Sequence, residues 1–130
     1  MTQEERQLLL RDLCARLPYG IKFPYHMNGD NSHKECNCIA TIDGINDDIV
    51  EFTYEENGVT RDWSCPISEV KPYLRSMGSM TEEEYQEFGY DVLRYTPREF
   101  DWLNAHHFDY RGMIEKGLAL EASADMYKTE

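Results

Sequence analysis

The fold class is decided by residues 49–65, which read IVEFTYEENGVTRDWSC. Apolar and polar side chains alternate through residues 49–54, the period-two pattern of a strand that buries one face. Asn57 and Gly58 follow, and this pair favours a tight hairpin turn because both central positions of such a turn have positive φ. Residues 59–65 alternate again, so the stretch predicts an antiparallel hairpin.

Strand patterns also precede this hairpin. Residues 21–26 and 36–45 read as strands, so the sheet is expected to be a bent antiparallel meander of three or four strands. If these strands curl, the sheet approaches a small barrel closed by the turn at residues 68–74.

Helix starts flank the sheet on both sides. Thr2 and Glu5 have the spacing of a capping box, and so do Thr81 and Glu84. Pro97 favours the first position of a further helix. We therefore expect helices over residues 3–17, 82–95 and 97–108, with a last short helix over residues 114–122.

The N-terminal helix carries an apolar stripe. Leu9 and Leu13 recur at helical spacing, and Cys14 lies beside them as an expected core residue. Asp12 and Arg16 are one turn apart and are expected on the solvent-facing side. The pattern predicts an amphipathic helix.

Together these elements predict an α+β fold with an N-terminal helix, a small bent antiparallel meander and two or three C-terminal helices. The chain has 130 residues, the usual size of one domain, and no linker composition divides it. We expect a single domain over residues 1–130. Residues 1–78 would hold the first helix and the meander, and residues 79–130 the helical C-terminal part.

The net charge of the chain is −12, from 25 acidic and 13 basic residues. Direct nucleic-acid binding rests on Lys and Arg that neutralise phosphates, so this class of partner is not expected. No apolar run reaches the roughly 18 residues of a membrane span, and the N-terminus lacks the order of a secretory signal. We expect a cytoplasmic protein with reduced cysteines and a protein partner, a basic host protein if the acidity serves recognition. The oligomeric state stays open.

Polar and aromatic residues are densest in residues 101–112, which read DWLNAHHFDYRG. Arg111 offers a planar fork suited to a carboxylate or phosphate. The alternative is structural, with Arg111 satisfying a helix C-terminus and Gly112 taking positive φ. The binding hypothesis names Trp102, Asn104, His106, Asp109, Tyr110 and Arg111.

The two adjacent histidines of this segment suggest a catalytic hypothesis. An imidazole titrates near neutral pH and a carboxylate fixes its tautomer, so His106 or His107 with Asp109 could act as a general base. The alternative is that His107 packs on the core while His106 is solvated. No nucleophile or nucleotide-binding motif accompanies them.

The cysteine spacing argues against a metal. Cys36 and Cys38 share one strand face, and the chain has no C-x2-C pair. We expect no metal site and no cofactor. Trp63 and Trp102 are each either a partner hot spot or a core residue, and the pattern favours neither reading.

A resemblance is carried by residues 13–20 (LCARLPYG), 69–75 (EVKPYLR), 79–84 (SMTEEE), 102–112 (WLNAHHFDYRG) and 117–122 (GLALEA). These segments resemble a family of small uncharacterised proteins encoded by gut anaerobic bacteria and by their phages and mobile elements. The resemblance implies an origin in the accessory gene pool, and it assigns no activity.

Acidity without a complete catalytic set favours a small non-enzymatic protein-interaction module of phage or mobile-element origin. Two alternatives stay open. One is a small-molecule hydrolase that uses His106 or His107 with Asp109. The other is an inhibitor that imitates nucleic acid with rows of carboxylates.

Overall fold

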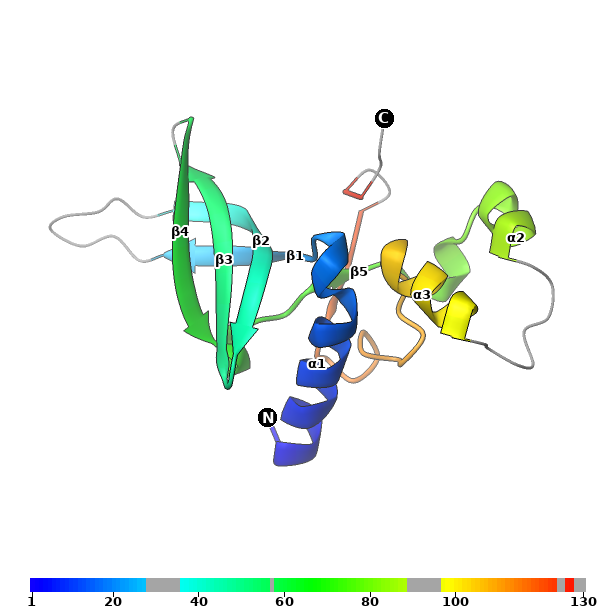
Figure 1. The fold of residues 1–130 in the computed structure, drawn as a ribbon, viewed down its shortest axis with the longest axis horizontal. Helices are drawn as coiled ribbons and strands as arrows, with labels where there is room; N and C mark the ends of the chain where they lie inside the picture. Colours follow the sequence, from blue (N-terminus) through cyan, green and yellow to red (C-terminus); the bar gives the residue numbers. More distant parts are fainter. Residues whose placement is uncertain (28–35, 57, 89–96, 124–125, 128–130) are drawn as a thin grey trace, which may run out of the picture. The chain divides into compact units, whose positions relative to one another are not determined.

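The computed structural model describes residues 1–27, 36–56, 58–88, 97–123 and 126–127 (Figure 1). This part of the chain has the predicted α+β architecture, with an N-terminal helix, a four-stranded antiparallel sheet and two α-helices after it. The chain divides into two compact units, Met1–Tyr73 and Leu74–Glu130.

The sheet of the first unit is a meander with the strand order β1-β2-β3-β4, and every neighbouring pair is antiparallel. The expected strands and their order are confirmed, and Gly58 in the hairpin turn has a φ of +80°. The sheet is open, because β1 and β4 have one neighbour each within the described residues, so the barrel-like closure is not found. The strands are β1 (Lys22–Met27), β2 (Cys36–Asn46), β3 (Ile49–Glu56) and β4 (Val59–Pro66).

One face of this sheet forms the core of the first unit. The rings of Phe23 and Phe52 meet edge to face with centroids 5.0 Å apart, and the ring of Tyr25 lies 4.6 Å from that of Phe52. Such pairs add specific geometry to the burial of large apolar surfaces. The buried side chains of the strands are Phe23, Ala40, Ile42, Val50, Phe52, Tyr54 and Cys65.

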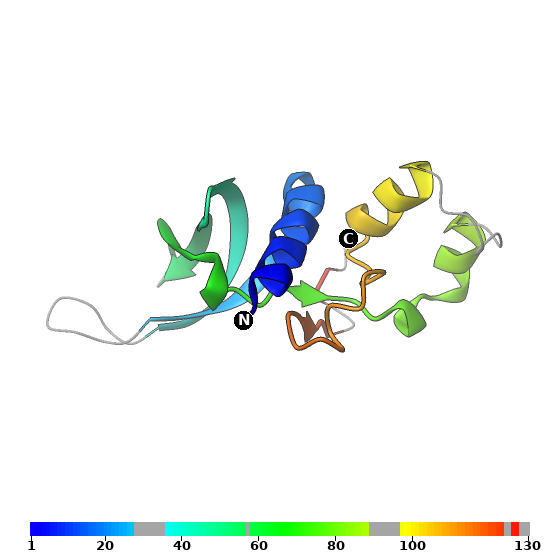
Figure 2. The ribbon, with the colours of Figure 1, turned by 90° about the horizontal axis from the view of Figure 1, so that it is seen from below.

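The helix α1 (Gln3–Arg16) lies beside the sheet in both views (Figures 1 and 2). Its capping box is confirmed, since the backbone N–H of Glu5 donates to the Thr2 hydroxyl and the backbone N–H of Thr2 donates to the Glu5 carboxylate. Leu9 and Leu13 are buried as expected. The helix therefore starts and packs as its sequence pattern predicts.

Two expectations for α1 are wrong. Asp12 and Arg16 are fully buried, and Arg16 Nε donates to Asp12 Oδ2 over 2.9 Å. Charged side chains can be buried when they form an ion pair. The charges of Asp12 and Arg16 were therefore no proof that these residues face solvent. Cys14, expected in the core, is exposed.

The cysteines also differ from expectation. Cys14 and Cys65 are free thiols. Cys38 is disulfide-bonded, so the expectation that every cysteine is reduced is wrong for this residue.

The second unit holds α2 (Glu82–Phe88) and α3 (Pro97–Ala105), and Pro97 is the first residue of α3 as predicted. The expected helical residues 89–95 and the cap Thr96 lie outside the described residues. The prediction of a helix over residues 114–122 is wrong, because these residues form turns and a short strand. Gly117 takes a φ of +74°, and β6 (Leu120–Glu121) pairs with β5 (Tyr73–Leu74).

None of the helices in the described part of the chain has the length and apolar character needed to traverse a membrane.

Candidate functional site

The chain leaves α3 through a left-handed residue, His107, whose φ is +65°. The backbone N–H of Phe108 donates to the carbonyl of Leu103 over 2.9 Å. The backbone N–H of His107 donates to the backbone carbonyl of Asn104 over 3.1 Å. This pair of bonds is a Schellman cap, in which glycine usually holds the left-handed position. The expected helix exit is therefore present, but it occurs at His107, and Gly112 makes a second turn with a φ of +73°.

Asp109 closes the loop that follows this exit. Its Oδ1 accepts from the backbone N–H of Met113 over 2.8 Å, and its Oδ2 accepts from the backbone N–H of Ile114 over 2.9 Å. The side chain is buried. Because both oxygens already hold backbone donors, the geometry gives Asp109 a structural role.

Three further residues of the binding hypothesis form a chain of contacts. The Tyr110 hydroxyl donates to Asn104 Oδ1 over 3.0 Å, and Asn104 is buried. The Arg111 guanidinium lies 4.8 Å from the centroid of the Tyr110 ring. The ring centroids of Phe100 and Tyr110 are 5.2 Å apart. Tyr110 therefore ties α3 to the loop that follows it.

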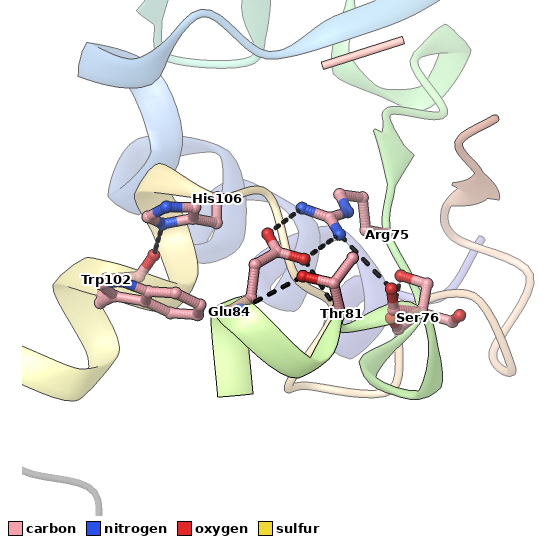
Figure 3. A network of polar contacts seen from close by, with 7 residues as sticks. Arg75, Ser76, Thr81, Glu84, Trp102 and His106 are labelled. Atoms are coloured by element: carbon pink, nitrogen blue, oxygen red, sulfur yellow. Dashed lines mark hydrogen bonds and ion pairs between the residues drawn. The ribbon is translucent and has the colours of Figure 1, made fainter. Parts of the chain in front are cut away.

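The two histidines occupy different surroundings. His106 Nδ1 lies 2.9 Å from the backbone oxygen of Trp102, and its ring stacks on the Trp102 indole at 4.0 Å (Figure 3). His107 is buried, and its ring stacks on Tyr127 at 3.7 Å. The alternative reading of His107 as a packing residue describes this arrangement, whereas His106 is stacked and half-buried rather than solvated.

The sequence pattern gave no sign of Arg75, which organises the polar contacts around α2. Its two terminal nitrogens each lie 2.7 Å from a different oxygen of Glu84, so the ion pair is bidentate (Figure 3). The Arg75 guanidinium also lies 4.2 Å from the Phe108 ring centroid. The backbone N–H of Arg75 donates to the carbonyl of His107, and the carbonyl of Arg75 accepts from the N–H of Asp109, so the backbone at Arg75 is fixed against the end of α3.

Glu84 takes part in two interactions at once. It completes the predicted capping box of α2, since its backbone N–H donates to the Thr81 hydroxyl and its carboxylate accepts from the Thr81 N–H. The hydrogen bonds from Arg75 are the main reason that the pKa of Glu84 falls to about 2, and the Thr81 N–H lowers it further. Hydrogen bonds to a carboxylate favour its charged form.

Trp102 is a member of the predicted site that borders a hollow. Its ring stacks nearly parallel to Phe108 at 5.8 Å and lies 5.2 Å from Phe88. The hollow has a volume of about 310 Å³ and is lined by Glu87, Phe88, Arg98, Glu99 and Trp102. Trp102 is half-buried, so this indole is mainly a packing residue of the second unit.

Trp63 has the opposite character. It is 63% exposed, the largest exposure of any large hydrophobic side chain among the described residues. It lies on β4, where only Cys65 is buried and Val59 is also 53% exposed. Each tryptophan could have been a core residue or an exposed contact residue. In the structure, Trp102 is packed in an aromatic cluster and Trp63 is exposed to solvent.

Carboxylates gather on the face of the sheet opposite to the one that carries Trp63. A shallow hollow of about 470 Å³ on this face is lined by the carboxylates of Asp43, Glu51 and Asp62. Its other lining residues are Phe52, Thr53, Trp63 and Ser64. Glu51 faces Ser64 across the β3–β4 pair, and a β-bulge between Ile42 and Gly44 accommodates Asp43. No Lys, Arg or His from the described residues lines this hollow.

The described residues contain no group of three or more His, Cys, Asp or Glu side chains that could hold a metal ion. Searches of protein families, curated proteins and solved structures found no match to this chain.

Proposed function

We propose that this protein is a non-enzymatic interaction module that binds another protein through the outer edge of β4. The single observation that carries the proposal is the 63% exposure of Trp63 on that strand. Trp is enriched among the residues that dominate binding energy at protein interfaces. An indole exposed on a strand is already positioned for contact.

The edge position of β4 supports the same proposal. β4 pairs with β3 on one side, and within the described residues it has no strand on the other. An edge strand presents unpaired N–H and C=O groups, which proteins usually blunt or cover. A partner strand that pairs with β4 would satisfy these groups.

The segment of residues 101–112 is the weaker candidate for the contact. Both Asp109 oxygens hold backbone N–H groups, and Asn104 accepts from Tyr110. Trp102 and Arg111 remain proposed as a second contact surface, since both are half-buried rather than sealed. The hydrolase alternative loses its main support because the Asp109 carboxylate is held by backbone donors.

Site-specific photocrosslinking tests this function. Trp63 is replaced by a benzophenone amino acid, and the protein is irradiated in bacterial cells. Ile39 is the matched control, because it is an exposed apolar residue at 54% on β2. We expect discrete crosslinked proteins from position 63 and none above background from position 39.

A third position separates the two surfaces. Phe100 is 36% exposed on α3 and contacts Tyr110, so a crosslinker there reports on the segment of residues 101–112. Crosslinks from position 100 alone would move the proposed contact to that segment. Equal crosslinking from all three positions would reject the β4 edge.

We further propose a phage or mobile-element origin, for which the sequence resemblance is the support. A cytoplasmic location is proposed as well, and it fits helices that are too short or too polar to cross a membrane in the described residues. A net charge of −12 fits a basic host protein as the partner. The genes flanking the coding sequence test the origin, since phage or transfer genes are expected there.

A further inference from the structure

The free edge of β4 has two chemically different faces. In an antiparallel pair, residues that face each other across the strands point to the same side of the sheet. Trp63 faces Phe52 and Asp62 faces Thr53, so Trp63 and Asp62 point to opposite sides. Any strand that pairs with β4 must match both faces.

The Trp63 face offers apolar contact. Val59 shares this face and is 53% exposed. Arg61 lies between them, and its Nε is 3.5 Å from a carboxylate oxygen of Glu56, which balances its charge. Apolar or aromatic side chains of an added strand would meet this row.

The Asp62 face offers negative charge. Asp62 and Glu51 border the same shallow hollow, with Asp43 beside them. No Lys, Arg or His from the described residues lines this hollow, so its charged lining is entirely acidic. Lys or Arg side chains reaching across from a neighbouring strand would gain favourable electrostatic interactions.

We propose that the occupant of the β4 edge is an extended segment of a partner protein in which Lys or Arg alternates with apolar residues. The segment adds to the sheet as a fifth strand. Side chains alternate across a strand with a period of two, so one face of this segment meets Trp63 and Val59 while the other meets Asp62 and Glu51. This inference rests on the proposed function and names the chemistry of its partner.

Charge argues against a second copy of the chain as the occupant. Each copy carries a net charge of −12, and like charges placed opposite each other across strands are destabilising. Pairing two β4 edges would bring Asp62 and its neighbouring carboxylates together. The same charge favours a basic strand.

Binding of defined peptides to the full-length protein tests the occupant. The first peptide alternates Lys with Val and is slightly longer than the eight residues of β4. Its controls are a peptide that alternates Glu with Val and one that has the Lys and Val residues in two blocks. Nitrogen–proton correlation spectra report binding at the amides of β4 and the indole of Trp63.

The expected result is binding of the alternating Lys peptide alone, with shifts at β4 and the Trp63 indole. The double variant Asp62→Asn with Glu51→Gln should weaken this binding by about tenfold, since each surface ion pair contributes modestly. The matched control removes the same charge at Glu82→Gln with Glu83→Gln on α2, where both side chains are exposed. It should change the affinity by less than about twofold.

Three results would overturn the inference. Equal binding of the block peptide would indicate general electrostatic attraction without strand pairing. Shifts confined to residues outside β4 would place the site elsewhere. A dimer in analytical ultracentrifugation that Trp63→Ala dissociates would make a second copy the occupant.

Failure of the inference can be told apart from failure of the proposed function. If position 63 crosslinks to a protein but the alternating Lys peptide does not bind, the edge is an interface and its partner has other chemistry. If position 63 crosslinks to nothing and no peptide binds, both proposals fall.

Discussion

Phe52 and Trp63 face each other across β3 and β4 on the same side of the sheet, yet Phe52 is fully buried and Trp63 is 63% exposed. At this pair the core of the first unit ends between the two strands, although Cys65 further along β4 is buried. One aromatic ring stabilises the fold, and its cross-strand neighbour extends past the core into solvent.

The two residues should respond differently to truncation. Phe52→Ala removes a buried ring and should lower the free energy of unfolding by about 3–5 kcal/mol. Trp63→Ala changes an exposed side chain and should cost about 0.5 kcal/mol or less. Urea unfolding of both variants measures the difference. A cost for Trp63→Ala near that of Phe52→Ala would mean that Trp63 is a packing residue and would remove the main support for the β4 interface.

The buried ion pair of α1 allows a second prediction. Asp12→Ala leaves the Arg16 charge buried without this carboxylate, and breaking a buried pair in this way typically costs about 3–5 kcal/mol. The double variant Asp12→Ala with Arg16→Met should cost less than Asp12→Ala alone, since it removes both charges.

Thermal or urea unfolding of the single and double variants gives the coupling energy. Glu4→Ala is the control, because Glu4 is exposed on the same helix. If the costs of Asp12→Ala and of Arg16→Met alone add up to the cost of the double variant, Asp12 and Arg16 do not stabilise the fold as a pair.

Local sequence patterns predicted the elements that local chemistry determines. The capping boxes at Thr2 and Thr81 form as expected, because cap and acceptor lie three residues apart in the chain. The strands around Gly58 also form, since alternation and a turn signal suffice to define a hairpin. These features need no knowledge of the rest of the fold.

Features that depend on distant partners were not predictable in this way. Asp12 and Arg16 look like a solvent-facing pair until the packing that covers them is known. Glu84 was recognised as a cap, but its partner Arg75 lies nine residues earlier in the chain, outside α2. The exposure of Trp63 likewise depends on where the core ends, which a strand pattern does not encode.

The Arg75–Glu84 ion pair makes stability depend on pH. The pKa of Glu84 is about 2 in the folded protein and 4.5 for an unperturbed carboxyl, so its contribution is present above pH 4.5 and is lost as the pH falls toward 2. Glu84→Gln should cost about 1–2 kcal/mol at pH 7 and progressively less below pH 4.5. Unfolding free energies across this range measure the effect.

Glu83→Gln is the matched control for this pH dependence. Glu83 is the neighbouring exposed carboxylate of α2, and its neutralisation should change stability little at any pH. A constant cost of Glu84→Gln down to pH 2 would contradict the ionic origin of the stabilisation.

The two thiols that are free within the described residues, Cys14 and Cys65, should differ in reactivity. Burial is the main reason that the pKa of Cys65 rises to about 11, and Glu69 raises it further. The thiolate is the reactive species, so Cys65 should resist iodoacetamide at pH 8. Cys14 is exposed and should be modified first.

Intact mass measured over time reports this order. Of these two thiols, Cys14 should carry the first adduct on the native protein, as located by peptide mapping. The adduct on Cys65 should appear only after denaturant is added. Early modification of Cys65 would mean that its side of β4 opens readily in the native state.

Asp109 distinguishes a structural from a catalytic reading of residues 101–112. Asp109→Ala leaves the N–H groups of Met113 and Ile114 without their acceptor, and it should lower the free energy of unfolding by about 1–3 kcal/mol. Asp101→Ala is the control, since Asp101 is an exposed carboxylate of the same segment. Urea unfolding compares the two variants. Catalytic groups are often held at a cost in stability, so a variant that is unchanged or more stable would revive the hydrolase hypothesis.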